Sequence, residues 1–414
     1  MHPIMSHHEY DLLIAGAGPA GCTLALKMAG KGLRIAVIEK DHFPRHKICG
    51  DALSGKVLNV LKRLPDGLYE RFIRDIDKIP SRGIRFTAPN LHSVDIPFMR
   101  DIGPETEPPG YVCRRADFDN FLFQQLKNYS GIDTFEGERV NEIFNQPDGI
   151  DVTTTRHQFT AQVIAGADGV HSAVRKYLRP GAAGKKHFCV GIRAYYKGVT
   201  GLHPENFIEL IFLKELLPGY FWIFPSPRGQ VNAGFGMMQS RLLRRKENLT
   251  HILDDLVTTH PLLAPRFQHA KAVSRAEAHT LPLGSFHFNR SGNRFVLLGD
   301  AAFLVDPFSG EGIGNAMASG EIASEILGKC FTDHNFSAEA LAGFDQRIHR
   351  RFGQEFRTTT IMQHLARSPW LFNMVVEKAR KNKEVSELLT AMFTSEDVKE
   401  KLTKPGFYAR LLFK

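Results

Sequence analysis

Cysteine is scarce in this sequence, and its few copies form no recognisable metal or disulfide framework. The chain has five cysteines among 414 residues, they lie far apart, and no two of them form a Cys-x-x-Cys pair. An odd number leaves at least one thiol unpaired, which favours reduced thiols in a cytoplasmic compartment and argues against a structural metal site. Because 43% of the residues are hydrophobic, we predict a globular protein of two or three domains that folds without covalent staples.

Long apolar runs are also missing. No segment approaches the roughly 20 apolar residues that span a bilayer. The first residues of the chain have no apolar core of the kind that a signal peptide carries. We therefore expect a cytoplasmic protein that is either soluble or peripheral to a membrane.

Concentrated charge of one sign is absent as well. The net charge is +9, yet the 53 lysines and arginines are scattered among 44 acidic residues. The chain has neither a basic arm nor a known reader motif, which argues against nucleic acid as a partner. A diffusely basic surface suits a phosphate-bearing ligand or an anionic membrane face. No internal repeat or other pattern predicts an oligomeric state.

Residues 10–39 carry the pattern of one βαβ unit. A buried-strand run ends in a Gly-x-Gly-x-x-Gly turn, an apolar helix follows, and a second buried strand ends in an acidic residue. This order within about 30 residues is typical of a parallel sheet that binds a dinucleotide. The successive parts are residues 10–15, the turn Gly16 to Gly21, residues 22–28, residues 34–38 and Glu39.

The residues of this turn have distinct expected tasks. Gly16 permits the tight turn, Gly18 lets the backbone approach a pyrophosphate, and Gly21 lets the helix and strand pack closely. The helix start offers free N–H groups and the positive end of its dipole to the phosphates. Glu39 suits a ribose without an extra phosphate, as in FAD or NAD. The alternative is a plain glycine-rich turn.

The remaining chain alternates between α/β segments and strand-rich segments, which indicates interleaved domains. Short strands with turn residues between them suit an antiparallel sheet, whereas buried strands and helices suit the parallel one. The predicted divisions are a discontinuous dinucleotide-binding domain at 9–78, 112–183 and 290–335, a substrate domain at 79–111 and 184–289, and a helical region at 336–414.

A second glycine-rich block follows the buried strand at residues 294–298. It contains Gly299-Asp300 and a late glycine segment, Gly310 to Gly314. With Asp168-Gly169, this block resembles the motifs of the FAD-dependent oxidoreductases of the para-hydroxybenzoate hydroxylase superfamily. The resemblance implies FAD as the cofactor, with Asp300 accepting hydrogen bonds from its ribityl hydroxyls. The late amides would stabilise negative charge on the reduced ring, as an oxyanion hole does. A helix N-cap is the alternative role for Asp300.

Within that superfamily, the segment from Pro44 to Gly50 resembles the Pro-x-x-Lys-x-Cys-Gly stretch of the geranylgeranyl reductase family. The aromatic stretch Tyr220 to Pro225 is similar to a cavity motif of the same family. The resemblance covers about residues 9–335. It implies a two-domain FAD protein that reduces carbon–carbon double bonds in polyprenyl chains, with Arg115 and the backbone at Val140 contacting FAD.

The predicted fold class is therefore α/β, with a Rossmann-like FAD-binding domain interleaved with a mostly antiparallel β-sheet substrate domain and a helical C-terminus. The electron donor stays open between NAD(P)H and a protein reductant. The predicted cofactor-binding residues are Gly16, Gly18, Pro19, Ala20, Gly21, Glu39, Lys40, Lys47, Cys49, Gly50, Arg115, Val140, Asp168, Gly169, Gly299, Asp300, Pro307, Gly310, Gly312, Ile313 and Gly314.

Cys49 is the candidate catalytic residue, because it would lie beside the flavin and orient substrate or supply a proton. A thiol with an ordinary pKa of about 8.5 is a modest acid at neutral pH, and the alternative is a small packing residue. Tyr220, Trp222 and Phe224 would form an apolar wall for the substrate, with only Tyr220 expected to hydrogen-bond. Ordinary core packing is the alternative for these three.

An amphipathic pattern over residues 361–383 is broken in two by Ser368-Pro369. We expect these helices to pack against the FAD-binding domain, because exposed apolar stripes are uncommon in soluble proteins. The alternative is that the stripe lies on anionic lipid as a peripheral membrane contact.

The predicted activity is hydride transfer from reduced flavin to an alkene in an isoprenoid or other apolar, lipid-like small molecule. One alternative is an FAD-dependent monooxygenase or halogenase. Phe303 and Glu311 stand where aromatic hydroxylases usually have His and Gln, whereas the stretch at 220–225 is half a match to the halogenase motif Trp-x-Trp-x-Ile-Pro. A further alternative is a non-catalytic flavin-binding redox sensor, against which an aromatic pocket for a second ligand argues.

Overall fold

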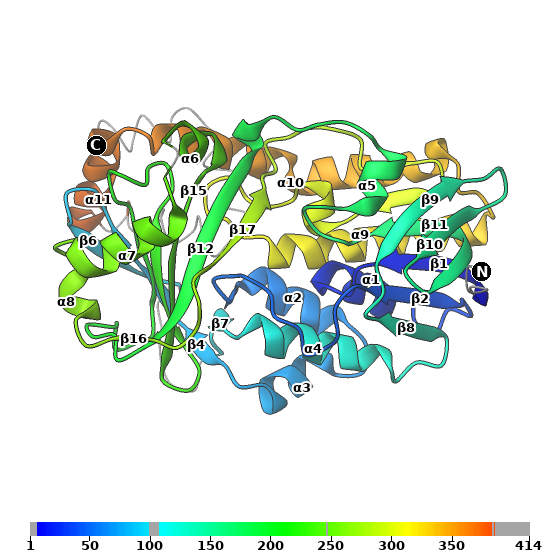
Figure 1. Cartoon of the computed structure of the whole chain (residues 1–414), viewed down its shortest axis with the longest axis horizontal. Coiled ribbons are helices and arrows are strands. Elements are labelled where there is room, and N and C mark those ends of the chain that lie inside the picture. Colours follow the sequence, from blue (N-terminus) through cyan, green and yellow to red (C-terminus); the bar gives the residue numbers. More distant parts are fainter. Residues whose placement is uncertain (1–5, 99–106, 246, 383–384, 386–414) are drawn as a thin grey trace.

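The computed structural model describes residues 6–98, 107–245, 247–382 and 385. Two large sheets lie toward opposite ends of the long axis of the molecule (Figure 1). The mixed α/β architecture and the helical C-terminal region confirm the predicted fold class.

The first sheet has a parallel centre, as the βαβ pattern predicted. Its strand order is β18-β19-β11-β1-β2-β8; in addition, β10 pairs antiparallel with β11, and β9 pairs antiparallel with β10. The central strands are apolar because helices cover them, and every residue of β2 is buried. The strands are β1 (Ser6–Ala15), β2 (Ile35–Glu39), β8 (Ile132–Glu136), β9 (Val140–Asn145), β10 (Ile150–Thr154), β11 (His157–Gly166), β18 (Ser291–Gly292) and β19 (Phe295–Leu297).

Helices α1 (Pro19–Met28), α4 (Arg115–Leu126) and α9 (Ile313–Thr332) pack together at this sheet, and α2 (Gly55–Arg63) packs on α9. α3 (Leu68–Asp75) contacts α2, and the short α5 (Ala173–Leu178) packs against β9 and β11. These elements share one apolar core, so the start of α1 and the start of α9 are held on a rigid base.

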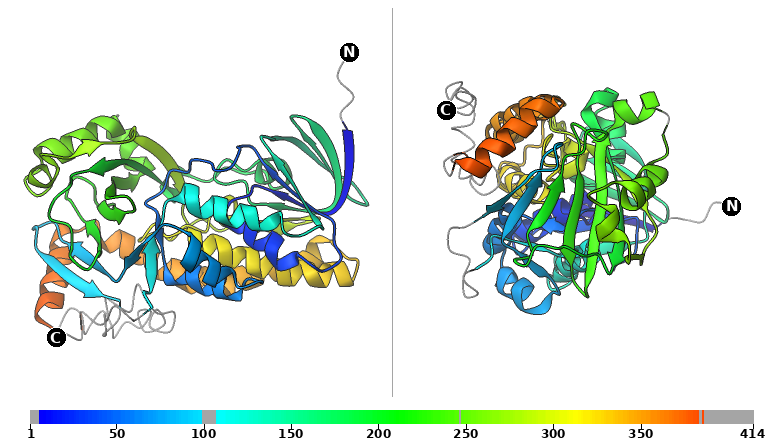
Figure 2. Two further views of the ribbon diagram at one scale, coloured as in Figure 1. Left: turned by 90° about the horizontal axis from the view of Figure 1, so that it is seen from below. Right: turned by 90° about the vertical axis from the view of Figure 1, so that its left-hand side faces the viewer.

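The second sheet is mostly antiparallel, and only β13 and β5 run parallel to one another. Helices α6 (Gln239–Arg245), α7 (Leu249–Thr259) and α8 (Ala264–Phe267) lie on its outer side (Figure 2). The strands are β5 (Gly83–Thr87), β6 (Ser93–Pro97), β12 (Phe188–Lys197), β13 (Ile208–Ile211), β14 (Phe221–Ser226), β15 (Gln230–Met238), β16 (Lys271–Ala272) and β17 (Glu277–Pro282).

A small third sheet joins segments that the sequence assigned to different domains. It consists of β3 (Ala52–Leu53), β7 (Gly110–Val112) and β4 (Ile79–Ser81), in the order β3-β7-β4. Two short 3₁₀ helices, η1 (Lys185–His187) and η2 (Gly299–Ala302), complete the described elements. The exact domain boundaries stay a prediction.

The C-terminal helices α10 (Ala338–Leu365) and α11 (Pro369–Lys381) are separated at the predicted break. α10 packs on α9 and β18 of the first sheet. The prediction that both pieces pack against the FAD-binding domain is wrong for α11, which contacts β6 and inserts Val376 and Ala379 into a core shared with Phe212 and Phe224. That core belongs to the inner side of the second sheet. The prediction was wrong because an amphipathic pattern does not specify which apolar surface a helix packs against. The predicted tail from residue 386 onward lies outside the described residues.

Candidate functional site

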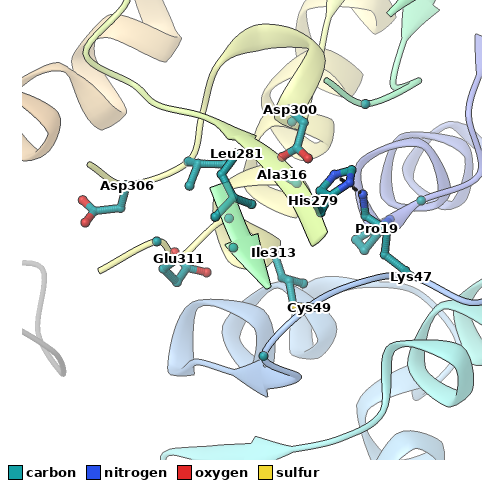
Figure 3. A pocket seen from close by; sticks show the side chains of 18 of the residues that line it. Pro19, Lys47, Cys49, His279, Leu281, Asp300, Asp306, Glu311, Ile313 and Ala316 are labelled. Carbon is teal, nitrogen blue, oxygen red and sulfur yellow. Dashed lines mark hydrogen bonds between the residues drawn. The ribbon is translucent and has the colours of Figure 1, made fainter. Parts of the chain in front are cut away.

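A cavity of about 860 Å³ lies between the two large sheets (Figure 3). It is lined by the start of α1, the loop between β2 and β3, the loop before α9, strands of the second sheet and α10. All of the predicted cofactor and substrate residues line it except Gly21 and Gly314. The fold thus gathers into one place residues that are far apart in the sequence, and their binding roles stay a prediction.

The glycine turn at one end of the cavity has the geometry that its spacing predicted. Gly16 has a φ of +99°, and a Cβ atom there would lie 2.3 Å from the carbonyl oxygen of Ala167. A Cβ at Gly21 would lie 2.0 Å from the Gly16 carbonyl oxygen, so this glycine serves helix-to-strand packing and not the cavity. Gly18 is the N-cap of α1, and the N–H groups at this helix start suit a pyrophosphate.

Glu39 lies at the end of β2 and faces this turn. Its Oε2 accepts a hydrogen bond from the Ala17 N–H at 3.0 Å and lies 3.5 Å from Arg45 Nε. The same guanidinium lies 3.1 Å from Asp119 Oδ2, and its Nη2 would be 3.5 Å from a Cβ at Gly18. Arg45 therefore adds a positive charge where phosphates would bind. Arg45 lies inside the Pro44 to Gly50 motif, but no spacing in the sequence marked it as a cofactor-binding residue.

Asp168 lines the cavity and also caps a helix, and its predicted contact with the cofactor stays a prediction. Its Oδ2 accepts hydrogen bonds from the N–H groups of Ala173 (2.6 Å) and Val174 (3.2 Å), so its side chain caps the start of α5. Burial raises the pKa of this carboxyl group. The part of this motif that faces the cavity includes the backbone at Gly169, which has a φ of +78°.

Lys47 and His279 form a close pair beside Asp300 (Figure 3). Lys47 Nζ lies 2.7 Å from His279 Nε2. Burial lowers the pKa of Lys47 and lowers that of His279 to about 4, and the neighbouring lysine charge adds to the second effect. A neutral imidazole can accept the hydrogen bond that Lys47 donates. His279 had no sequence signal, because it comes from the distant strand β17.

Cys49 lies on the loop that the family resemblance placed beside the flavin. Its side chain is half-buried and lines the cavity, and burial raises its pKa, so the thiol is protonated at neutral pH. The Cys49 carbonyl oxygen accepts a hydrogen bond from Asn232 Nδ2 at 2.8 Å. Asn232 also donates to Asp51 Oδ2 at 2.8 Å and accepts from Trp222 Nε1 at 3.0 Å.

The aromatic wall of β14 is therefore less purely apolar than predicted. The expectation that only Tyr220 hydrogen-bonds is wrong, because the Trp222 indole N–H donates to Asn232. The Tyr220 hydroxyl donates to the carbonyl oxygen of Ser309 in the loop before α9. The Tyr220 tip thus reaches the loop before α9 and the Trp222 tip reaches Asn232 on β15, while Trp222 and Phe224 also line the cavity. Phe224 packs so closely on the Cys49 loop that a Cβ at Gly50 would lie 2.9 Å from its ring.

The late glycine segment lines the cavity up to Ile313. The prediction that the amides from Gly312 to Gly314 are available to stabilise charge is wrong for Gly314. Its N–H donates to Glu311 Oε1 at 2.8 Å, so a carboxylate of the chain already occupies that position at the start of α9.

Helix α10 forms a wall that the sequence analysis did not predict. Gln363 is buried, donates to the Pro307 carbonyl oxygen at 2.5 Å, and thereby ties this helix to the late loop. No motif covered this region, which lies beyond the family resemblance. The residues of α10 that line the cavity are Glu355, Thr358, Thr359, Met362 and Gln363.

The parallel sheet, the glycine turn with its acidic partner and the shared cavity together define a dinucleotide-binding oxidoreductase. The FAD binding domain family matches residues 9–334, which is most of the chain. The protein therefore belongs to this family and is an FAD-dependent oxidoreductase. Gly18, Arg45 and Glu39 fit the diphosphate and ribose of FAD, because a close backbone approach, a cation and an acceptor face one end of the cavity.

Two relatives bear on the type of oxidoreductase. Digeranylgeranylglycerophospholipid reductase of Methanosarcina acetivorans is 28% identical over 370 residues, which cover 86% of this chain and 84% of that protein. Menaquinone reductase of Mycolicibacterium smegmatis is 28% identical over 326 residues, which cover 77% of this chain and 76% of that protein. The first of these relatives confirms the predicted resemblance to the geranylgeranyl reductases.

Solved structures show the same fold. A geranylgeranyl bacteriochlorophyll reductase-like protein from Thermoplasma acidophilum matches with a TM-score of 0.82 at 21% identity over 98% of each chain. A triple mutant of a flavin-dependent brominase matches with a TM-score of 0.76 at 19% identity, over 97% of this chain and all of that one. At such identities the likeness concerns the fold alone.

Proposed function

We propose that this protein reduces carbon–carbon double bonds in the isoprenoid chain of a lipid-like substrate. The observation that carries this proposal is the wall of Trp222 and Phe224 rings opposite the predicted flavin loops, in one cavity with the Cys49 thiol. Apolar rings hold a long hydrocarbon chain through burial of surface, at about 25 cal/mol per Å². The reductases among the relatives have names that point to lipid or quinone substrates, which supports the same substrate class.

Bound FAD would supply a hydride from its reduced ring to one carbon of the double bond. The adjoining carbon then needs a proton. Cys49 is suited to deliver it from Sγ, because its raised pKa keeps the thiol protonated at neutral pH. Asn232 holds the Cys49 backbone from the substrate side, and the Arg115 guanidinium lies beside the thiol and favours the thiolate that proton donation leaves.

A lipid substrate also needs a route into the cavity. Met362 lines the cavity, and Ile361 and Leu365 on the same helix are exposed. Trp370 at the start of α11 is 71% exposed, and Arg367 lies between the two helices. We propose that these side chains contact an anionic membrane surface next to the cavity. No helix within the described residues is long and apolar enough to cross a bilayer.

The test is an anaerobic reaction of the chemically reduced holoprotein with a lipid that carries a geranylgeranyl chain. We expect the flavin to reoxidise without oxygen and the product mass to increase by two hydrogens for each reduced bond. A fully saturated chain of the same length is the control and should leave the flavin reduced. A reaction that requires oxygen and adds an oxygen or halogen atom would support the monooxygenase or halogenase alternative instead.

A further inference from the structure

A buried charge cluster lies beside the late glycine loop, and no step of the proposed reaction uses it. Lys56 Nζ lies 2.8 Å from Glu355 Oε1, 2.9 Å from Asn315 Oδ1 and 3.8 Å from Glu311 Oε2. The side chains of Lys56, Glu355 and Glu311 are 14%, 8% and 21% exposed. All three residues line the cavity, so their charges face the space that FAD and substrate are proposed to share.

The cluster carries more negative than positive charge. Burial alone would lower the pKa of Lys56, but Glu311, Glu355 and Asp306 together raise it, so the ammonium form persists. Asp306 is buried, and its Oδ2 has no hydrogen-bond partner within the part of the chain that the structure describes. Two carboxyl groups therefore lie within 4 Å of one ammonium group, and the charge of a third also acts on it.

Glu311 is the member of the cluster that is fixed at the start of α9. Its Oε1 accepts hydrogen bonds from the Gly314 N–H at 2.8 Å and from Ser54 Oγ at 3.3 Å. A Cβ at Gly314 would lie 2.6 Å from Lys56 Cβ and 2.8 Å from Glu311 Oε1, so only glycine leaves room for both side chains. The positive end of this helix is thus covered by a carboxylate of the chain.

We propose that Glu311 lowers the reduction potential of bound FAD and so makes the reduced cofactor a stronger hydride donor. Two-electron reduction of the flavin takes up two electrons and one proton at neutral pH, so the ring gains one negative charge. A carboxylate that lines the same cavity opposes that gain by Coulomb repulsion. The inference rests on the proposed position of the flavin beside residues 306–314 and does not depend on the identity of the substrate.

The test compares midpoint potentials of the FAD-loaded protein and of Glu311→Gln, without substrate. Xanthine with xanthine oxidase supplies the electrons, and a reference dye reports the potential. Glutamine keeps the shape of the side chain and can still accept from Gly314 and Ser54, but it removes the charge. We expect the equilibrium constant for flavin reduction to rise at least tenfold, which is about 30 mV for a two-electron couple. Glu325→Gln removes an exposed carboxylate from the same helix and should leave the potential unchanged.

Two further variants keep the inference open to refutation. Glu355→Gln should shift the potential in the same direction by a smaller amount, and it replaces the first variant if Glu311→Gln does not retain FAD. Lys56→Met should shift the potential in the opposite direction. Equal potentials in the parent protein, Glu311→Gln and Glu355→Gln would overturn the inference and leave the proposed alkene reduction standing. A shifted potential in a protein that does not reduce the alkene would support the role of Glu311 and contradict the proposed alkene reduction.

Discussion

Replacing Asn232 by leucine tests whether the substrate sheet holds the Cys49 loop in place. The asparagine side chain is fully buried and bonds the Cys49 carbonyl oxygen, Asp51 Oδ2 and the Trp222 indole at 2.8 to 3.0 Å. Leucine has a similar volume but can make none of these bonds. Asp51 keeps its hydrogen bond from the Tyr195 hydroxyl at 2.5 Å, but it loses the bond from Asn232, as do the Cys49 carbonyl and the Trp222 N–H.

Leucine removes three hydrogen bonds, each of which contributes roughly 0.5 to 1.5 kcal/mol, so the free energy of unfolding should fall by about 1.5 to 4.5 kcal/mol. That is a large part of a typical stability of about 5 to 15 kcal/mol. Urea unfolding followed by far-UV circular dichroism measures this loss, and the exposed Asn128→Leu is a control expected to stay within about 0.5 kcal/mol. A loss below about 1 kcal/mol for Asn232→Leu would refute the proposed role of this network.

Three other predictions concern the cofactor, the proton donor and the membrane. Gly18→Val should abolish FAD binding, measured by absorbance. It should change the melting temperature of the apoprotein little, because a Cβ at Gly18 contacts only the Arg45 side chain, at 3.5 Å. Gly16→Val should destabilise the fold itself, because a Cβ there would lie 2.3 Å from a carbonyl oxygen. Cys49→Ala should retain FAD and lower turnover severalfold, and an unchanged rate would exclude the thiol as proton donor. Turnover of the parent protein should fall only as the pH rises above about 8.5, because burial raises the thiol pKa. Trp370→Ser should weaken co-sedimentation with vesicles that contain phosphatidylglycerol, and it should change co-sedimentation with neutral phosphatidylcholine vesicles only slightly. Equal binding of the parent protein and the variant to the phosphatidylglycerol vesicles would argue against the proposed membrane contact.

The first βαβ unit could be predicted in detail because its signals are local. Hydrophobic runs, the glycine spacing and the acid at the end of β2 lie within about 30 residues, and together they form one known pattern for a dinucleotide-binding βαβ unit. The same holds for the break before Pro369, where a proline begins α11. Family resemblance extended the prediction to the Cys49 loop and the aromatic strand, which both line the cavity.

The parts that the sequence did not predict depend on contacts between distant segments. His279 meets Lys47 across 232 positions of sequence, and Asn232 meets Cys49 across 183. Such pairs leave no period or spacing in the chain. Gly314 shows a related limit: its amide was predicted to face the cofactor, whereas the structure explains the glycine by the space that Lys56 and Glu311 require. The prediction for α11 was wrong for the same reason, because an apolar stripe on a helix does not specify which surface the helix packs against.

The two hydrogen bonds at the tips of Tyr220 and Trp222 have a consequence for communication within the molecule. One reaches the loop before α9 through Ser309, and the other reaches the Cys49 loop through Asn232. Both begin on one short stretch of chain, and the residues that carry them line the cavity. Any displacement of these two rings would therefore shift hydrogen-bond partners on the loop before α9 and on the Cys49 loop together, so residues 220–222 link the two loops.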